Sequence, residues 1–217
     1  MALADQLRLM VLTDPVLLQG RDAVDVCRRA TAGGGGATMV QVRWKDGTPR
    51  ELLQLAQALV LVLPVPVLVN DRVDVALAAG AAGAHLGQDD APLDKLRPEL
   101  PPGFLLGVSV GSALEAERVR AWPADYWSVG PCFATGNKAD AGAALGPDGF
   151  AALARLAPEG MPVIGIGGVT AGNAAEVIRA GAVGVAVIGA VLGAADPQDA
   201  ARGLRAAVTD GGSLSRA

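Results

Sequence analysis

The stretch VPVLVNDRVDVALAAGAAGAHLGQDD, residues 65–90, decides the fold. It contains two short apolar runs, residues 65–69 and 82–86, and each run is followed by acidic side chains. This order is typical of a β-α-β unit, whose two parallel strands end at the same edge of a sheet. We therefore expect Asp71 and Asp90 to lie close together at that edge, where a hard cation can bridge the protein and a phosphorylated ligand.

The alternation of short apolar runs with Ala/Leu-rich amphipathic segments recurs about eight times along the 217 residues. Eight units of roughly 27 residues match the compact size of a (β/α)8 barrel. We predict an α/β fold, a (β/α)8 TIM barrel, as a single domain over residues 1–209, with a frayed tail over residues 210–217. An open six-stranded sheet is the alternative. The predicted strands cover residues 7–12, 37–43, 65–69, 82–86, 105–110, 126–129, 163–166 and 184–188.

Composition and charge restrict the class of protein. The sequence is 51% hydrophobic but only 3% aromatic, as expected where Ala, Val and Leu fill the contacts between short strands and closely packed helices. A net charge of -4 and a pI near 5.0 provide no general attraction for nucleic acid or anionic membranes. Any phosphate binding must therefore depend on locally placed Arg and Lys.

Cysteine usage and hydropathy favour a cytoplasmic protein. Cys27 and Cys132 cannot form a disulfide framework, and their spacing is not that of a metal site. Asp5 precedes any long apolar run, and no uncharged stretch of roughly 18 to 20 residues has the composition of a membrane span and is free of helix breakers. We expect neither an export signal nor a membrane anchor, and the sequence is compatible with a homo-oligomer.

Local signals predict where several helices begin and end. Residues 48–51 (TPRE) and 112–115 (SALE) have the pattern of capping boxes, and Asp196 followed by proline opens the last helix in the same style. Gly80 and Gly181 follow Ala-rich runs and are expected to end helices in a left-handed conformation.

The residues just after each strand are the candidates for function, because the working face of such a barrel lies at the carboxyl ends of its strands. Alternation along the second strand places Gln41, Arg43 and Lys45 on the same side. Two cations and an amide aimed together are suited to bind a diphosphate. The alternative is a strand end whose charges are merely solvated.

Asp71, after the third strand, and Asp90, after the fourth, are candidate ligands for one Mg²⁺ ion per site. Magnesium prefers one or two carboxylates, with water and substrate phosphate oxygens completing an octahedron. Asp89 is the weaker candidate, and we expect it to cap the helix that starts near Pro92, a role that Asp90 can also fill.

Nucleophilic catalysis is not expected from this sequence. Ser109, near the end of the fifth strand, has no general base nearby in the sequence, and the single histidine, His85, is predicted to pack inside the barrel. The long loop after the sixth strand, residues 130–138, is typical of a lid. In this loop Lys138 would bring a cation over a bound anion, and Cys132 is predicted to be a packing residue.

Glycines follow the last two strands, at Gly167-Gly168 and at Gly189. Barrel enzymes often bind phosphate with backbone N–H groups from these two loops, and glycine lets the backbone approach the ligand. The position of these glycines in the count of eight units predicts a second phosphate site.

Five segments together resemble the thiamine phosphate synthase family, and the resemblance covers nearly the whole chain. The segments are VQVRWK (40–45), NDRVD (70–74), HLGQDD (85–90), VGPCFAT (129–135) with Lys138, and IGG (166–168). The resemblance implies a transferase of thiamine biosynthesis that acts on small molecules, without a nucleic-acid or membrane partner. It would condense 4-amino-5-hydroxymethyl-2-methylpyrimidine diphosphate with 4-methyl-5-(2-hydroxyethyl)thiazole phosphate to give thiamine phosphate and pyrophosphate.

The resemblance also implies roles for individual residues. The diphosphate leaves first, and the thiazole nitrogen then captures the pyrimidine cation, so no base or nucleophile is needed; Arg43, Lys45, Lys138 and Ser109 would be catalytic. Asp71 and Asp90 would bind Mg²⁺. The pyrimidine diphosphate would contact Gln41, Arg43, Lys45, Asn70, Ser109 and Lys138. The thiazole phosphate would contact Thr135, Gly168, Ile188 and Gly189, with Asn137 in the same loop as Thr135.

The sequence departs from the family pattern at Trp44, usually acidic, Gly111, commonly histidine, Asn137, usually threonine, and Gly189, usually serine. Asn137 keeps a polar side chain and Gly189 keeps a backbone N–H. Two alternatives follow. A thiazole tautomerase-like isomerase would not need the cations and aspartates that are retained, and it would need the histidine that is missing at Gly111. A non-catalytic sensor of phosphorylated ligands on the same fold is compatible with the changes at Asn137 and Gly189.

Overall fold

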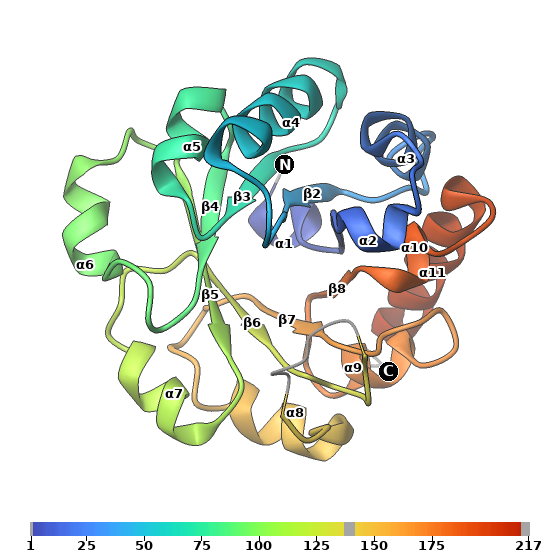
Figure 1. The fold of residues 1–217 in the computed structure, drawn as a ribbon. Coiled ribbons are helices and arrows are strands. Elements are labelled where there is room, and N and C mark those ends of the chain that lie inside the picture. Colours follow the sequence, from blue (N-terminus) through green and yellow to red (C-terminus); the bar gives the residue numbers. More distant parts are fainter. Residues whose placement is uncertain (1, 137–141, 214–217) are drawn as a thin grey trace.

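The computed structural model describes residues 2–136 and 142–213. In this part of the chain eight parallel strands close into a barrel in the order β1 to β8, and helices surround it (Figure 1). The prediction of a (β/α)8 barrel is confirmed. The strands are β1 (Leu9–Leu12), β2 (Met39–Val42), β3 (Val67–Asn70), β4 (Gly83–Leu86), β5 (Leu105–Val110), β6 (Tyr126–Val129), β7 (Val163–Ile166) and β8 (Gly184–Val187).

Helices or short helical turns precede, connect and follow the strands. They are α1 (Leu3–Gln6), α2 (Pro15–Leu18), α3 (Ala23–Ala30), α4 (Pro49–Val62), α5 (Val73–Ala79), α6 (Leu93–Leu96), the 3-10 turn η1 (Arg97–Glu99), α7 (Ala113–Val119), α8 (Gly146–Ala154), α9 (Ala174–Arg179), α10 (Gly189–Leu192) and α11 (Pro197–Ser213).

Most of the predicted helix signals are confirmed. Thr48 and Glu51 form a capping box at the start of α4, and Asp196 accepts hydrogen bonds from the first backbone N–H groups of α11. Gly80 ends α5 with a positive φ of 68°. The second predicted capping box is only half formed, because Ser112 accepts from the Glu115 N–H whereas the Glu115 carboxylate binds elsewhere.

The barrel is closed by β1, which pairs with both β2 and β8. Because all strands are parallel, their carboxyl ends meet at one rim. Alternate strand residues point to opposite sides. Val11, Val40 and Val69 belong to the large apolar cluster that the helices cover, whereas Met10 and Leu68 belong to a smaller cluster of alternating strand residues that fills the interior.

Several predicted boundaries were wrong. Leu7 and Ala37 are apolar and buried, as expected for strand residues, but their N–H groups donate to the carbonyl groups of Leu3 and Ala30 in local turns before β1 and β2 begin. The predicted frayed tail was also wrong at its start. Helix α11 continues to Ser213, and Gly211 packs against Ala175 and Ile178 of α9. Residues 214–217 lie outside the described part of the chain.

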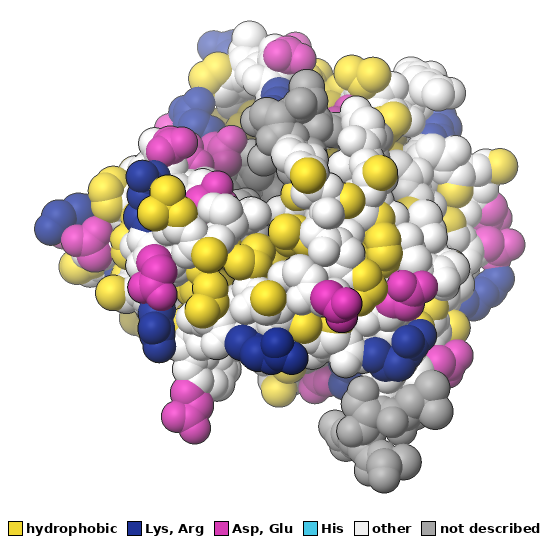
Figure 2. Space-filling model, turned by 90° about the horizontal axis from the view of Figure 1, so that it is seen from below, with side chains coloured by type: hydrophobic (Ala, Val, Ile, Leu, Met, Phe, Trp, Pro, Cys, Tyr) yellow, Lys and Arg dark blue, Asp and Glu magenta, His cyan; other side chains and the backbone are white. Residues whose placement is uncertain are grey.

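Side chains of both charges are interspersed over the face that Figure 2 shows, seen from below relative to Figure 1. Apolar side chains lie between them on the same face. Of the helices that the structure describes, not one combines the length and the hydropathy that crossing a bilayer requires.

Candidate active site

A cavity of about 730 Å³ opens at the carboxyl ends of the strands. Such a volume accommodates a small organic ligand. Most of the residues predicted from the sequence line it, and they come from opposite sides of the barrel. They are Gln41, Arg43, Lys45, Asn70, Asp71, Ser109, Thr135, Gly168, Ile188 and Gly189.

Arg43 is fixed at the rim by the residues that follow β1. Its Nη1 donates to Asp14 Oδ2 at 2.9 Å. The Thr13 hydroxyl accepts from the Arg43 N–H and donates to the Arg43 carbonyl, both at 2.9 Å. Asp14 is also the N-cap of α2, where it accepts from two backbone N–H groups. The guanidinium is therefore held in one place, because its partner is itself anchored.

Gln41, one step earlier on β2, is buried with 2% of its surface exposed. Its Nε2 is 3.5 Å from Met10 Sδ, a weak acceptor. Its Oε1 has no hydrogen-bond partner among the described residues. A buried amide oxygen without a partner is unfavourable, and a ligand donor in the cavity would satisfy it.

Asp71 and Asp90 follow neighbouring strands, as expected. Asp71 lines the cavity in a left-handed conformation with φ of 62°, and its N–H donates to the His85 carbonyl at 2.8 Å. Asp90 does not line the cavity itself. Its Oδ2 accepts from the N–H of Gly87, which does, at 2.7 Å.

The prediction that Asp89 caps the next helix is wrong. Helix α6 begins after Pro92 without a side-chain cap. The Asp89 side chain is 98% exposed and its carboxylate lies 3.5 Å from Arg118. Because Gly87 turns the chain and Asp90 bonds back to it, Asp89 points outward to solvent.

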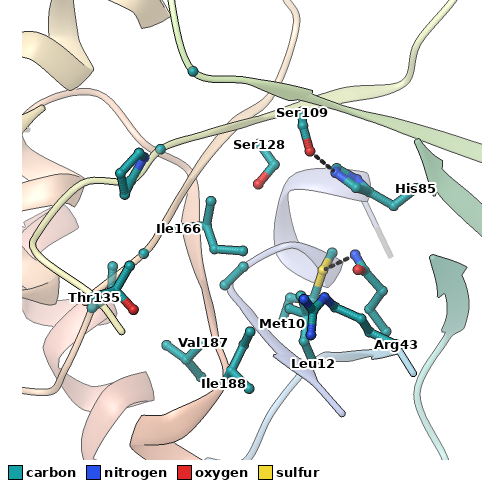
Figure 3. Close-up of a pocket in the computed structure, with 18 of the residues that line it drawn as sticks. Met10, Leu12, Arg43, His85, Ser109, Ser128, Thr135, Ile166, Val187 and Ile188 are labelled. Atoms are coloured by element: carbon teal, nitrogen blue, oxygen red, sulfur yellow. Dashed lines mark hydrogen bonds between the residues drawn. The ribbon is translucent and has the colours of Figure 1, made fainter. Parts of the chain in front are cut away.

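His85 packs inside the barrel, as predicted, but it also contacts Ser109. Its Nε2 lies 2.9 Å from Ser109 Oγ, and its Nδ1 lies 2.8 Å from the Tyr126 hydroxyl. Figure 3 shows the contact between His85 and Ser109 at the cavity wall. This pair is not evident from the sequence, because β4 and β5 bring together residues that are distant in the sequence.

Gln88 and Glu115 brace the wall next to Ser109. Gln88 Nε2 donates to the Ser109 carbonyl at 2.7 Å and to Glu115 Oε2 at 2.8 Å. Glu115 Oε2 also accepts from the Gly111 N–H at 2.5 Å. A Cβ at Gly111 would lie 3.3 Å from that oxygen. Because Gly111 stands where the family commonly has histidine, the Glu115 carboxylate occupies space next to a position without a side chain.

The loops after β6 and β7 approach each other through glycine. Gly168 has a φ of 65°, and a Cβ there would lie 2.6 Å from the Ala134 carbonyl oxygen. Cys132, in the loop after β6, is fully buried, and burial raises the pKa of its thiol to about 12, as expected for a packing residue. Asn137 and Lys138 lie outside the described residues.

The two sides of the cavity differ in character. Figure 3 shows Arg43 and His85 on one side, and Thr135, Val187 and Ile188 on the opposite side. The second side also includes the backbone of Gly167, Gly168 and Gly189. The first presents charged and polar side chains, whereas the second presents backbone groups between small or apolar side chains.

Comparisons with known proteins show the family to which this chain belongs. The profile of the thiamine monophosphate synthase family matches residues 9–191. A thiamine-phosphate synthase of Methanoculleus marisnigri is 48% identical over 201 residues, covering 91% of this chain and 93% of the relative. One from a Roseiflexus species is 46% identical over 201 residues, covering 91% of this chain and 84% of the relative.

Solved structures give the same result. Thiamine phosphate pyrophosphorylase from Pyrococcus furiosus matches with a TM-score of 0.84 and 36% identity, over 97% of this chain and 99% of that one. The likeness to a 3-hexulose-6-phosphate synthase from Salmonella typhimurium, at 19% identity and a TM-score of 0.73 over 94% of this chain and 99% of that one, shows the fold alone. With the profile matched over most of its length, this chain belongs to the thiamine monophosphate synthase family.

Proposed function

We propose that this chain is a thiamine-phosphate synthase that joins the pyrimidine diphosphate to the thiazole phosphate and releases pyrophosphate. The observation that carries the proposal is a cavity with two unlike sides. Arg43 and Lys45 border one side, and the backbone of Gly168 and Gly189 borders the other. A cavity of this kind can hold two phosphorylated substrates next to each other, which lowers the entropy cost of joining them.

The cationic side suits the departing diphosphate. As the bond between the pyrimidine methylene carbon and the diphosphate oxygen breaks, the oxygen keeps the electron pair and gains negative charge. Arg43, held by Asp14, is already oriented before this charge develops, and preorganised charges of this kind lower the barrier without reorganisation. The thiazole nitrogen then supplies the electron pair of the new C–N bond, so the protein needs no nucleophile. Lys138 is assigned to the same side from the sequence alone.

Asp71 and Asp90 would hold one Mg²⁺ ion. The Asp71 N–H bonds to the β4 carbonyl of His85, and Asp90 is fixed by Gly87, with no described residue bonded to its second oxygen. The described residues contain no group of three or more His, Cys, Asp or Glu placed to hold a metal. The residues fit an ion that takes its remaining ligands from water and substrate phosphate. When bound, the ion would supply positive charge to the leaving diphosphate.

The side of the cavity that contains Gly168 and Gly189 would hold the thiazole phosphate. Gly168, Gly189 and Thr135 border the cavity there, with Ile188 beside them. Backbone N–H groups in the loops after β7 and β8 bind phosphate in many barrels of this type. Asn137, in the same loop as Thr135, is assigned to this side from the sequence alone.

The cytoplasm is the proposed location. Cys27 and Cys132 are both buried and free, and burial raises the pKa of each thiol to about 12. Protonated, buried thiols are suited to a reducing compartment, because they pack as small apolar groups and form no disulfide.

One assay tests the proposed function. The purified protein is incubated with both phosphorylated substrates, with and without Mg²⁺, and pyrophosphate and thiamine phosphate are quantified. Both products should form in equal amounts, and only with Mg²⁺. Isomerisation of the thiazole substrate without condensation would instead identify a tautomerase. Binding of both ligands without product would identify a sensor, and either result would overturn the proposal.

A further inference from the structure

A chain of three hydrogen-bonded side chains leads from the barrel core to the cavity. Tyr126 is fully buried and does not line the cavity, whereas His85 and Ser109 do. The Tyr126 hydroxyl lies 2.8 Å from His85 Nδ1, and His85 Nε2 lies 2.9 Å from Ser109 Oγ. The three residues come from adjacent strands β6, β4 and β5, with Gly107 of β5 between Tyr126 and His85.

Gly107 leaves the space that the first of these bonds needs. A Cβ at Gly107 would overlap both the Tyr126 ring and His85 Nδ1. The two rings lie 5.5 Å apart between centroids, tilted by 33°. A larger residue at this position would separate the phenol from the imidazole, so the backbone itself keeps the two groups in contact.

The direction of these two hydrogen bonds, from donor to acceptor, follows from the burial of Tyr126. Burial raises the pKa of its hydroxyl above the ordinary value, so the O–H stays protonated and remains a donor. Among the hydrogen bonds of the described residues, His85 is its partner. If Nδ1 carried the imidazole proton, the phenol O–H would be buried without an acceptor, which is unfavourable. The phenol therefore donates to Nδ1, and the proton of the neutral imidazole resides on Nε2.

This polarity is the reverse of that in a Ser-His-Asp triad. In the triad a carboxylate accepts from Nδ1–H, and Nε2 is left as the base that takes the serine proton. With the imidazole proton on Nε2, the 2.9 Å contact between Nε2 and Ser109 Oγ is a bond that Nε2–H donates, so His85 cannot take the proton of Ser109 in this form. The Ser109 oxygen is occupied as an acceptor, and its own O–H must be donated to another group.

We propose that Tyr126 is a positioning residue which, through the Nε2–H tautomer of His85, directs the Ser109 hydroxyl hydrogen into the cavity as a donor to an anionic ligand oxygen. Identifying that oxygen as part of the departing diphosphate rests on the proposed function. The hydrogen-bond direction itself does not, and it is measurable in the protein without ligand.

The first experiment uses the single histidine of the chain. In protein labelled with nitrogen-15 histidine, at a pH where the imidazole is neutral, two-bond proton–nitrogen correlation spectra show which ring nitrogen carries the proton. We expect His85 to be protonated on Nε2 alone. A proton on Nδ1, or an average over both nitrogens, would overturn the proposal.

Three variants locate the cause of that tautomer. Tyr126→Phe removes only the phenol oxygen and should give the Nδ1–H form or an average of the two forms. Ser109→Ala removes the hydroxyl at the other end of the three hydrogen-bonded side chains and should retain Nε2–H. Ser128→Ala is the matched control, because Ser128 is buried, lines the same cavity and pairs with Ser109 across the strands. It should also retain Nε2–H. An unchanged tautomer in Tyr126→Phe would contradict the role of Tyr126.

Steady-state kinetics then connect the tautomer to the reaction. In Tyr126→Phe, Nε2 becomes able to accept the Ser109 proton, which withdraws the donor from the leaving group. We expect kcat to decrease about tenfold with less than about a twofold change in KM, because the bond to the diphosphate strengthens as charge develops. In a Ser109→Ala background, Tyr126→Phe should cause no further decrease. Additive decreases in kcat for the two substitutions would contradict the coupling between Tyr126 and Ser109. If the wild-type protein formed no thiamine phosphate, the proposed function would be wrong, and the spectra would still decide the tautomer of His85.

Discussion

The two sides of the cavity use different chemical means to present themselves to a ligand. On the side formed by β2 to β5, the groups are side chains, such as Arg43 held by Asp14 and Ser109 held by His85. On the side formed by the loops after β6, β7 and β8, close approach of the backbone at Gly168 is the main feature. On the side formed by β2 to β5, each of these functional side chains is oriented by another residue behind it. On the side formed by the loops after β6, β7 and β8, the backbone can approach a ligand because glycine has no side chain.

This difference predicts how each side responds to substitution. A functional side chain can be neutralised while the fold remains, because its supporting partner stays in place. Gly168 cannot gain a side chain without moving the neighbouring loop. Variants on the first side should therefore affect turnover more than stability, and variants on the second should affect both.

The largest effect is expected for Asp90→Asn. The amide oxygen can still accept from the Gly87 N–H, so the turn is preserved, but the charge proposed to hold Mg²⁺ is lost. We expect kcat to decrease about a hundredfold. Asp89→Asn is the matched control, because the neighbouring carboxylate is 98% exposed, and its turnover should equal that of the wild type. Pyrophosphate release measures both, and normal turnover of Asp90→Asn would remove this residue from the site.

Gly168→Ala is expected to have the next largest effect. Its Cβ would lie 2.6 Å from the Ala134 carbonyl, and the φ of 65° is unfavourable for alanine, so the β6 and β7 loops must separate. We expect the KM for the thiazole phosphate to increase about tenfold and the free energy of unfolding to decrease by about 1 to 2 kcal/mol.

Gly172→Ala is the control for that variant. It lies in the loop after β7, its Cβ would be 3.7 Å from the nearest side-chain atom, Thr170 Oγ1, and its φ is not in the left-handed region. Denaturant unfolding and substrate titration should give wild-type values for this control. If the two glycine variants behaved alike, close backbone approach at Gly168 would not be the property that matters.

A smaller effect is expected for Asp14→Asn on the cationic side. Asparagine caps a helix as well as aspartate does, so α2 keeps its start while Arg43 loses its charged partner. We expect the KM for the pyrimidine diphosphate to increase about fivefold, because the guanidinium must be ordered when the ligand binds. Asp22→Asn, at the equivalent cap of α3, is the control and should leave KM unchanged. Equal KM values for the two variants would show that Asp14 acts only as a cap.

The barrel and most of its rim could be predicted from the sequence, because both depend on local patterns. Each strand is a short apolar run followed by polar or glycine residues, and parallel strands bring those ends together. The same signal, a polar residue after a strand, was available for Asp14 and Gln88. Strand starts could not be predicted as well, because residues such as Leu7 are buried whether or not they pair.

The supporting contacts could not be predicted, because they depend on register between strands. Tyr126 has the pattern of an ordinary core aromatic residue, and nothing near it in the sequence indicates a bond to His85. Likewise, Glu115 fits a capping box, but the fold takes its carboxylate to Gln88 and Gly111. Sequence patterns identify the residues that face a ligand, whereas the residues behind them are visible only in three dimensions.

Gln41→Met is expected to have the smallest effect, with opposite signs for stability and binding. The substitution preserves volume and removes the buried Oε1 that has no partner among the described residues. Without ligand, the free energy of unfolding should therefore increase by about 1 kcal/mol, because an unsatisfied buried acceptor is lost. The KM for the pyrimidine diphosphate should increase by about threefold, because the substitution also removes the polar contact that we propose between Gln41 and this ligand. Thermal unfolding with and without that ligand measures both, and the ligand should stabilise the wild type more than the variant. A decrease in the free energy of unfolding without ligand would show that the Gln41 amide already has a hydrogen-bond partner in the empty cavity. In that case this side of the cavity would not lower the stability of the folded protein in order to bind its ligand.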